Sequence, residues 1–414
     1  MRDMEILNKK SGGSQTVLRE RNIALVINTI RENGPITKKD IVSITGLSFA
    51  KVNNTILYLT EKGLTHESGK EESIGGRPST LFKLNANYRY VIGCQLSHSL
   101  IKTIICNLNG EVIASQEISY DKSMGKEVVV NLLLQEIERL ISDSKIPIEK
   151  FLGVGIAVAG LINPKDETIL PFPHLVQWGN ISLTAIIKEK LKLPCYVKNV
   201  ANAAALAEFN YGMGRGKSNL LFLNIGSGLG MGIIINGNLY EGFSGTAGEF
   251  GHITVDENGP LCECGNVGCL ETVASIKAVV NRAKEMLQQG VFSSMMTKVD
   301  NDLTKLNFDV ICEAANESDK LALSLIAKMG EALGEGIVTL INLFNPELIV
   351  LGGPVIQAKD LLIHPLLNIV RKRALEIPRV DTQIEFSEIN GNVGTIGAVI
   401  PIVESFFSDA LKTD

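Results

Sequence analysis

The N-terminal part of the chain places its apolar residues at helical spacing, with short polar breaks between the helices. The first predicted helix ends at Asn33-Gly34. Its apolar face consists of Ile23, Val26, Ile27 and Ile30. Thr37 is the N-cap candidate of a second helix, which Gly46 ends, and Ser48 is the N-cap candidate of a third. Two short helices joined by a tight turn indicate a helix-turn-helix.

The third predicted helix is suited to a DNA major groove because its early residues are mostly small or polar. Asn can pair with adenine edges, and Lys with guanine or phosphate. Residues 64–85 then predict two short strands around a glycine-rich tip, where Arg77 suits a narrow minor groove. The predicted DNA-contacting residues are Thr37, Ser48, Phe49, Lys51, Asn53, Asn54 and Arg77. The alternative is a three-helix module for protein contacts or dimerisation.

From Tyr90 onward, the pattern changes to apolar strands that alternate with helices. Strands are predicted at residues 90–97, 100–110, 111–120 and 151–162, with a helix at 126–143. A second round begins with two strands around Gly226–Gly230 and continues with a helix at 320–344, a strand at 348–353 and a late helix. A hairpin-led α/β unit that occurs twice predicts two lobes with a ligand-binding cleft between them.

We therefore predict three parts in the chain. Residues 1–85 form a winged helix-turn-helix, residues 86–198 form a first lobe to which a C-terminal helix at 393–414 returns, and residues 199–392 form a second lobe with the dimerisation surface. The net charge is −5, but residues 1–85 hold 13 Lys and Arg against 9 Asp and Glu. A basic segment ahead of an acidic body is consistent with nucleic-acid contact, although chance is the simpler explanation.

Composition narrows the class of protein. Apolar residues make up 45% of the 414 residues and charged residues 21%, as in ordinary soluble globular proteins. No stretch approaches the roughly 20 apolar residues that span a bilayer. The N-terminus is polar and contains acids, so it resembles neither a signal nor a transit peptide. We therefore predict a cytoplasmic protein without a membrane partner.

Three of the seven cysteines fall within eight residues and follow a histidine. His252, Cys262, Cys264 and Cys269 have the spacing H-x9-C-x-C-x4-C. One imidazole and three thiolates complete a tetrahedral set for Zn²⁺ and leave no position for water, which predicts a structural role. The alternative is four reduced side chains in a loop.

Two carboxylates flank this cluster. Glu249 precedes His252 by three residues, and Glu271 follows Cys269 by two. A metal-bound loop would hold both rigidly, and fixed carboxylates accept the hydrogen bonds that a polyhydroxy ligand donates. Surface charges on the loop are the alternative.

These motifs resemble those of the ROK family, which groups bacterial sugar kinases with sugar-responsive transcriptional repressors. The matching segments are Gly248–His252 and Cys262–Glu271. The resemblance spans nearly the whole chain and includes the N-terminal module, which the repressor branch has and the kinase branch lacks. Within the repressor branch, the chain is similar to the xylose-repressor-type regulators. The resemblance implies a two-lobed, actin-like (ribonuclease H-like) α/β fold with a structural zinc loop.

The resemblance also implies the sugar-binding residues. By position, these are Asn199, Glu249, His252 and Glu271, with Gly160 and His174 in the lining of the pocket. His252 would use one ring nitrogen for zinc and offer the other to the sugar. The alternative for His174 is an ordinary loop histidine.

Two departures from the family pattern argue against phosphoryl transfer. Val200 falls where family kinases have the aspartate that acts as general base, and removing such a base typically costs a factor of ~10²–10⁴ in rate. Residues 95–99 read Gln-Leu-Ser-His-Ser where those kinases have an Asp-x-Gly-Gly-Thr turn for phosphate and Mg²⁺. The glycine-rich turns Gly226–Gly230 and Gly352-Gly353 persist, and we interpret them as inherited geometry.

The expected function is therefore that of a sugar-responsive, DNA-binding transcriptional regulator without kinase activity. Repression is expected because it is the commoner mode of action in the family. Its partners would be operator DNA and a sugar or sugar phosphate. Two-fold DNA half-sites require a homodimer or homotetramer. One alternative is a sugar kinase with a DNA-binding appendage, and another is a dimerisation scaffold that binds no effector.

Overall fold

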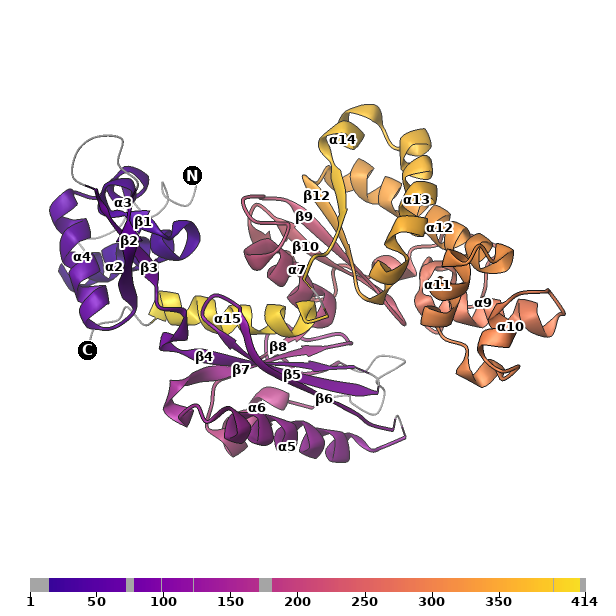
Figure 1. The fold of residues 1–414 in the computed structure, drawn as a ribbon, viewed down its shortest axis with the longest axis horizontal. Helices are drawn as coiled ribbons and strands as arrows, with labels where there is room; N and C mark the ends of the chain where they lie inside the picture. Colours follow the sequence, from indigo (N-terminus) through magenta and orange to yellow (C-terminus); the bar gives the residue numbers. More distant parts are fainter. Residues whose placement is uncertain are drawn as a thin grey trace.

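The computed structural model describes residues 15–71, 78–97, 99–121, 123–170, 181–389 and 391–409 (Figure 1). An N-terminal module comes first, and we define it as residues 15–85. Its helices are α2 (Gln15–Asn33), α3 (Lys38–Thr45) and α4 (Phe49–Glu61). Its strands are β1 (Ile36–Thr37), β2 (Thr65–Lys70) and β3 (Thr80–Leu84), which pair antiparallel in the order β1-β3-β2.

The predicted helix caps of this module are confirmed. Thr37 Oγ1 accepts the Asp40 N–H at 3.2 Å at the start of α3, and Ser48 Oγ accepts the Lys51 N–H at 3.4 Å at the start of α4. Gly46 ends α3 with φ 67°, a left-handed conformation that glycine adopts without strain. The predicted apolar faces are buried and form the core of the module.

The first lobe is built on a five-stranded sheet in the order β6-β5-β4-β7-β8. Its strands are β4 (Tyr90–Leu96), β5 (Leu100–Asn107), β6 (Val112–Ser119), β7 (Phe151–Val158) and β8 (Cys195–Asn199). Helices α5 (Lys126–Ser144) and α6 (Leu183–Leu191) cover one face, and α15 (Val393–Asp409) lies on the other (Figure 1). The strands alternate with the helices much as the hydrophobic pattern predicts.

The second lobe repeats this arrangement with the sheet order β11-β10-β9-β12-β13. Its strands are β9 (Leu220–Ile225), β10 (Leu229–Ile235), β11 (Asn238–Leu239), β12 (Leu348–Gly352) and β13 (Gln383–Phe386). In both sheets, three antiparallel strands are followed by two parallel ones. The predicted duplication of a hairpin-led α/β unit is therefore confirmed.

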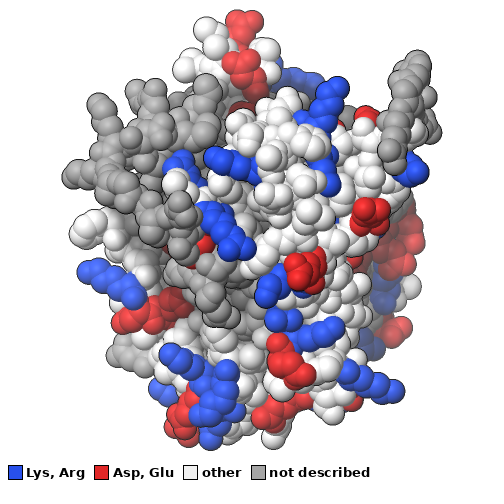
Figure 2. Space-filling view, turned by 90° about the vertical axis from the view of Figure 1, so that its left-hand side faces the viewer, with Lys and Arg blue, Asp and Glu red and all other residues white. Residues whose placement is uncertain are grey.

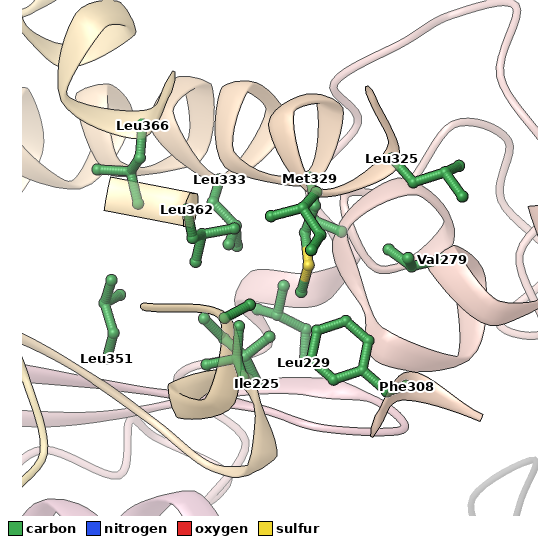
Figure 3. Packing of buried hydrophobic residues seen from close by; sticks show 14 of the residues in the cluster. Ile225, Leu229, Val279, Phe308, Leu325, Met329, Leu333, Leu351, Leu362 and Leu366 are labelled. Carbon is green, nitrogen blue, oxygen red and sulfur yellow. The ribbon is translucent and has the colours of Figure 1, made fainter. Parts of the chain in front are cut away.

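Helices of the second lobe cover its sheet and supply the largest core. They are α8 (Glu271–Ala274), α9 (Ile276–Gln288), α10 (Met295–Lys298), α11 (Phe308–Asn316), α12 (Lys320–Phe344), α13 (Lys359–Arg373) and α14 (Glu376–Asp381). Leu351 and Ile225 on the sheet face Leu333 and Met329 of α12 and Leu362 of α13 (Figure 3). These apolar contacts fix the strand ends that border the cleft.

Two helices lie between the sheets, α15 and α7 (Val200–Tyr211). They touch through small residues, because a Cβ on Gly397 of α15 would overlap the backbone oxygen of Ala203 in α7. A Cβ on Gly232 of β10 would likewise overlap the backbone oxygen of Ala201. Helix α7 is thus in direct contact with both α15 and the second sheet. Over the described ranges, no helix has both the length and the hydropathy to cross a bilayer.

Candidate functional site

A cavity of about 1870 Å³ lies between the lobes. Its walls come from places where strands end. Asn199 ends β8, the turn Gly226–Gly228 joins β9 to β10, and Gly353 follows β12. Gly394, in the first turn of α15, also lines the cavity. Parallel strands that end at one edge of a sheet leave a crevice there, which is where α/β proteins bind ligands. The predicted cleft is therefore present at the expected edge.

Asn199 stands at the junction of strand and helix. Its Oδ1 accepts the N–H groups of Ala201 at 2.8 Å and Asn202 at 3.4 Å, so it is the N-cap of α7. Its Nδ2 donates to the backbone oxygen of Gly160 at 2.9 Å. Gly160 follows β7 and also lines the cavity, so this amide ties two neighbouring strand ends together.

The position next to Asn199 is apolar. Val200 lines the cavity beside Gln95 and Gly394. A Cβ on Gly394 would lie 3.1 Å from Val200 Cγ2 and would collide with Gln95 Oε1, so the three residues meet closely. Gln95 Nε2 donates to Ser97 Oγ at 3.1 Å. Valine and glutamine carry no ionisable proton, so neither of these two side chains can act as a general base or supply a carboxylate to Mg²⁺.

Glu249 and His252 also line the cavity. His252 lies in a short 3₁₀ turn, Phe250–His252, and its Nε2 is 3.8 Å from Glu249 Oε2. The Glu249 side chain is 40% exposed, so a ligand in the cavity can reach it. Burial raises the pKa of the Glu249 carboxyl, the nearby His252 lowers it, and the nearby Glu271 raises it. Glu249 and Glu271 are therefore close enough to interact.

Glu271 begins α8 and has a second role. Its Oε2 accepts the Leu229 N–H at 2.8 Å, which holds the glycine-rich turn between β9 and β10 against the helix. A Cβ on Gly228 would lie 2.8 Å from the same oxygen, so a larger residue there would displace this carboxylate. Glu271 and Glu249 together form what we call the carboxylate wall of the cavity. Glu271 thus connects this wall to the glycine-rich turn, which we interpret as geometry inherited within the family.

The four predicted metal ligands lie together. The ligand atoms of His252, Cys262, Cys264 and Cys269 are all within 4.8 Å of one another. Cys262 Sγ is 3.6 Å from His252 Nδ1, and Cys264 Sγ is 3.7 Å from Cys269 Sγ. A tetrahedral Zn²⁺ with bonds of about 2.3 Å to sulfur and about 2.0 Å to nitrogen separates such atoms by about 3.5–3.8 Å. The cluster could therefore hold a metal ion.

The loop that carries the cysteines folds back on itself. Gly265 and Gly268 have φ of 91° and 68°, and a Cβ on Gly268 would overlap the backbone oxygen of Asp256. The Cys262 N–H donates to the Asn266 oxygen at 2.7 Å, which closes the loop around the thiols. His252 turns Nδ1 to the thiols and Nε2 to Glu249, so its two nitrogens face the two predicted roles.

The predicted DNA-contacting residues that the structure describes differ in exposure. Phe49, Lys51 and Asn54 are exposed on α4. Ser48 is exposed but its hydroxyl caps the helix, and the half-buried Asn53 accepts from Lys38 Nζ through Oδ1 at 2.8 Å. The prediction that Thr37 contacts DNA is wrong, because this residue is 2% exposed and its hydroxyl also donates to Asp40 Oδ2 at 2.6 Å.

Two predicted residues, Arg77 in the wing tip and His174 in the pocket lining, lie outside the described residues. The side of the molecule that carries the N-terminal module bears Lys and Arg with Asp and Glu among them (Figure 2). Over the part that the structure describes, this face therefore carries both signs of charge. The features of the module that favour DNA binding are therefore helix α4, whose start is fixed by its N-cap, and the exposed side chains at that start.

One ion pair between the two lobes could not be predicted from the sequence. Lys198 Nζ lies 3.0 Å from Glu241 Oε1, which joins β8 of the first lobe to the loop after β11 of the second. The same loop approaches the first lobe at Gly245, where a Cβ would lie 2.6 Å from Pro164 Cδ. Lys198 directly precedes Asn199, but a partner 43 residues away cannot be predicted from spacing.

A sheet of three antiparallel and two parallel strands, repeated around a cleft, defines an actin-like α/β protein. Residues 91–404 match the ROK family, and the chain belongs to that family. The xylose repressor of Caldicellulosiruptor bescii is 32% identical over 396 residues, which cover 96% of this chain and 98% of the repressor. The resemblance inferred from the sequence is thus confirmed.

Two solved structures extend the comparison. A ROK family transcriptional regulator, a homologue of the E. coli MLC protein, has a TM-score of 0.80 at 30% identity and covers 95% of this chain and 98% of its own. A ROK family glucokinase from Streptomyces griseus, in complex with glucose and AMPPNP, has a TM-score of 0.68 at 28% identity. The glucokinase covers 97% of its own chain but only 75% of this one.

Proposed function

We propose that the protein is a sugar-responsive, DNA-binding transcriptional regulator that acts as a repressor. The observation that carries the proposal is the composition of the cleft. Groups that bind hydroxyls line it at Asn199, Glu249, His252 and Glu271, whereas Val200 and Gln95 stand at the corner where a kinase needs carboxylates. A cleft that keeps the means of binding and lacks those of catalysis is suited to sensing.

The proposed effector is a monosaccharide held by the carboxylate wall and the Asn199 amide. Carboxylates accept hydrogen bonds from sugar hydroxyls, and the amide can donate one. D-xylose is the first sugar to test, since a relative of full length is named a xylose repressor. D-glucose is the second, since a structural relative binds it. His174 and Gly160 complete the proposed pocket.

Zn²⁺ is the proposed cofactor, held by His252, Cys262, Cys264 and Cys269. With four protein ligands, it would be structural and would fix the loop between Glu249 and Glu271. His252 Nδ1 faces the thiols, so its Nε2 can meet the ligand beside Glu249. Structural zinc of this kind holds the sugar-binding groups in place and takes no part in a reaction.

The N-terminal module is the proposed DNA reader, a winged helix-turn-helix within residues 1–85. Helix α4 would enter the major groove, with Lys51 and Asn54 exposed toward the bases or phosphates. Residues 86–198 with the returning α15, and residues 199–392, are the two sensing lobes. Paired DNA half-sites require two copies of the chain, so a homodimer or homotetramer in the bacterial cytoplasm is part of the proposal.

The experiment tests binding and response together. DNA is first selected from a random-sequence pool with the purified full-length protein, and its dissociation constant is then measured with and without D-xylose or D-glucose. We expect one sugar to change DNA affinity by about 5- to 150-fold, the usual range of allosteric coupling. DNA binding that ignores every sugar in a broad panel would contradict the sensing role.

A kinase assay addresses the second candidate function. Purified protein with ATP, Mg²⁺ and the bound sugar should release no ADP above the background of a no-protein control. Turnover in the range of ordinary enzymes, about 1–10³ s⁻¹, would instead identify a kinase with a DNA-binding appendage. The Val200→Asp variant serves as a control, because Gln95 should keep it inactive as well.

A further inference from the structure

Helix α15 connects the cleft to the N-terminal module. Its first residues, Val393 and Gly394, line the cavity beside Gln95 and Val200. Its last turns reach the module, where Phe406 and Phe407 belong to the same apolar cluster as the core of α2 and α4. Figure 1 shows the helix running from the space between the sheets to the module. One helix therefore touches both the cleft and the module that carries the proposed DNA-binding surface.

The middle of α15 has no room to move alone. A Cβ on Gly155 of β7 would overlap the backbone oxygen of Ala398, and a Cβ on Gly93 of β4 would overlap that of Thr395. Gly397 meets Ala203 of α7 in the same way. Helix α7 in turn lies on the second sheet at Gly232. Because interiors at this density are not continuously deformable, a rotation of the lobes must displace α15 against at least one neighbour.

The contact at the far end of the helix is specific. The guanidinium of Arg31, at the end of α2, lies 4.9 Å from the centre of the Phe407 ring. Phe406 meets the Phe407 ring edge-on at 5.1 Å and the Tyr88 ring at 6.4 Å. Glu404 is close enough for Arg31 to lower the pKa of its carboxyl, against the larger effect of burial, which raises it. A planar guanidinium on a ring fixes an orientation as well as a distance.

We infer that Arg31 and Phe407 are positioning residues that set the orientation of the N-terminal module on the body, so that α15 passes the state of the cleft to the DNA-binding surface. This inference rests on the proposed function. It assigns the coupling to one helix and one contact, and it does not depend on which sugar binds. Loss of the contact should leave both binding sites intact and uncouple them.

The test measures the ratio of DNA dissociation constants with and without sugar, using the selected DNA and D-xylose, with D-glucose as the second probe. In Arg31→Gln and Phe407→Leu, we expect this ratio to fall toward one by about 2- to 30-fold, the equivalent of one cation–π contact. The thermal shift that the sugar produces should stay the same, because no cleft residue changes. Arg31→Lys keeps the charge and loses the planar face, so its ratio should lie between that of the wild type and that of Arg31→Gln.

Arg19→Gln is the matched control. Arg19 is on the same helix, and its guanidinium lies 5.3 Å from the Tyr58 ring, but that contact is internal to the module. The control should keep the wild-type ratio. If Arg31→Gln does not fold, as judged by circular dichroism, Arg31→Lys and Phe407→Leu carry the test.

The outcomes separate the two proposals. A wild-type protein whose DNA affinity changes with sugar, with the same ratio in the Arg31 and Phe407 variants, overturns the relay and leaves the proposed function standing. A wild-type protein that binds DNA without any response to sugar overturns both. An equal loss in Arg19→Gln would also overturn the relay, since general weakening of the module would then explain the effect.

Discussion

At the scale of single residues, the cleft uses side chains that serve the fold and the proposed ligand together. Asn199 caps α7 and also holds the backbone of Gly160. Glu271 holds the Leu229 N–H and lines the cavity. Side chains locked by such hydrogen bonds are already in place when a ligand arrives, and this reduces the entropy lost on binding.

We predict that Asn199→Ala weakens both stability and sugar binding. Loss of an N-cap should lower the free energy of unfolding by about 0.5–2 kcal/mol, and a lost hydrogen bond to the sugar should reduce its affinity roughly 2- to 10-fold. Ser182→Ala is the control, because Ser182 caps α6 through the Ala185 N–H. Denaturant unfolding and sugar titration check both. Unchanged sugar affinity in Asn199→Ala would remove this residue from the proposed site.

A second prediction concerns the buried Glu208 near the end of α7. Glu208 is fully buried, and its carboxylate bonds the Ser387 hydroxyl and accepts the Met213 N–H at 3.0 Å. Burial raises the pKa of this carboxyl, although the two hydrogen bonds lower it. Since the folded-state pKa is the higher one, the stabilising contribution is present below the unfolded pKa and is lost as pH rises through the folded pKa.

Glu208→Gln should therefore gain stability relative to wild type as the pH is raised from about 5 to about 8, measured by denaturant unfolding at each pH. Glu347→Gln is a control of opposite sign. The pKa of Glu347 is lowered, first by the N–H groups of Ser218 and Asn219, so its contribution is present above the unfolded pKa and is lost as pH falls. The free energy of unfolding of Glu347→Gln should therefore fall furthest below that of the wild type near neutral pH. Parallel pH profiles for the two variants would contradict the assignment.

At the scale of elements, the loop from Glu249 to Glu271 is the part of the site that depends most on the proposed zinc ion. Within this span, short helical turns and isolated β-bridges alternate, and the hydrogen bonds are mostly local. Its turns at Gly265 and Gly268, where φ is positive, bring the four ligands together. Next to the cysteines, the apolar side chains Leu261 and Val267 are exposed, so a bound metal would supply much of the stability of this part of the loop.

We predict that freshly purified protein contains one zinc ion per chain, and that Cys264→Ser or a strong chelator removes it. The sugar response should then be lost or reduced at least tenfold, because second-shell and ligand changes at metal sites commonly have effects of about 10–100-fold. Cys195→Ser is the control, since this half-buried thiol is far from the cluster in sequence and is not one of its ligands. Metal analysis that finds no zinc in the wild type would end the proposal.

Local signals predicted most of the elements but not the contacts between them. The caps at Thr37 and Ser48, the strand-to-helix junction at Asn199 and the long helix at 320–344 follow from residue types at fixed short spacing. Lys198–Glu241 and Arg31–Phe407 join residues far apart in the chain, where no periodicity applies. The sequence marks Thr37 both as a helix cap and as a DNA contact, and its burial in the structure leaves only the cap.

At the scale of the whole molecule, the two lobes and the N-terminal module are joined through α7 and α15. The proposed function makes a thermodynamic demand on this assembly. If a sugar in the cleft changes DNA affinity by some factor, bound DNA must change the affinity for that sugar by the same factor. The requirement holds whichever way the lobes turn, and whether one helix or several contacts carry the coupling.

We predict that the two factors agree within about twofold when each is measured by titration at equilibrium and at the same salt concentration, since DNA affinity is strongly salt-dependent. Sugar titrations would use protein alone and protein saturated with the selected DNA. A short DNA of shuffled sequence is the control and should leave sugar affinity unchanged. Unequal factors would show that the sugar acts through another equilibrium, such as assembly of the chains, because a cleft and a module linked only through the folded body cannot be coupled in one direction.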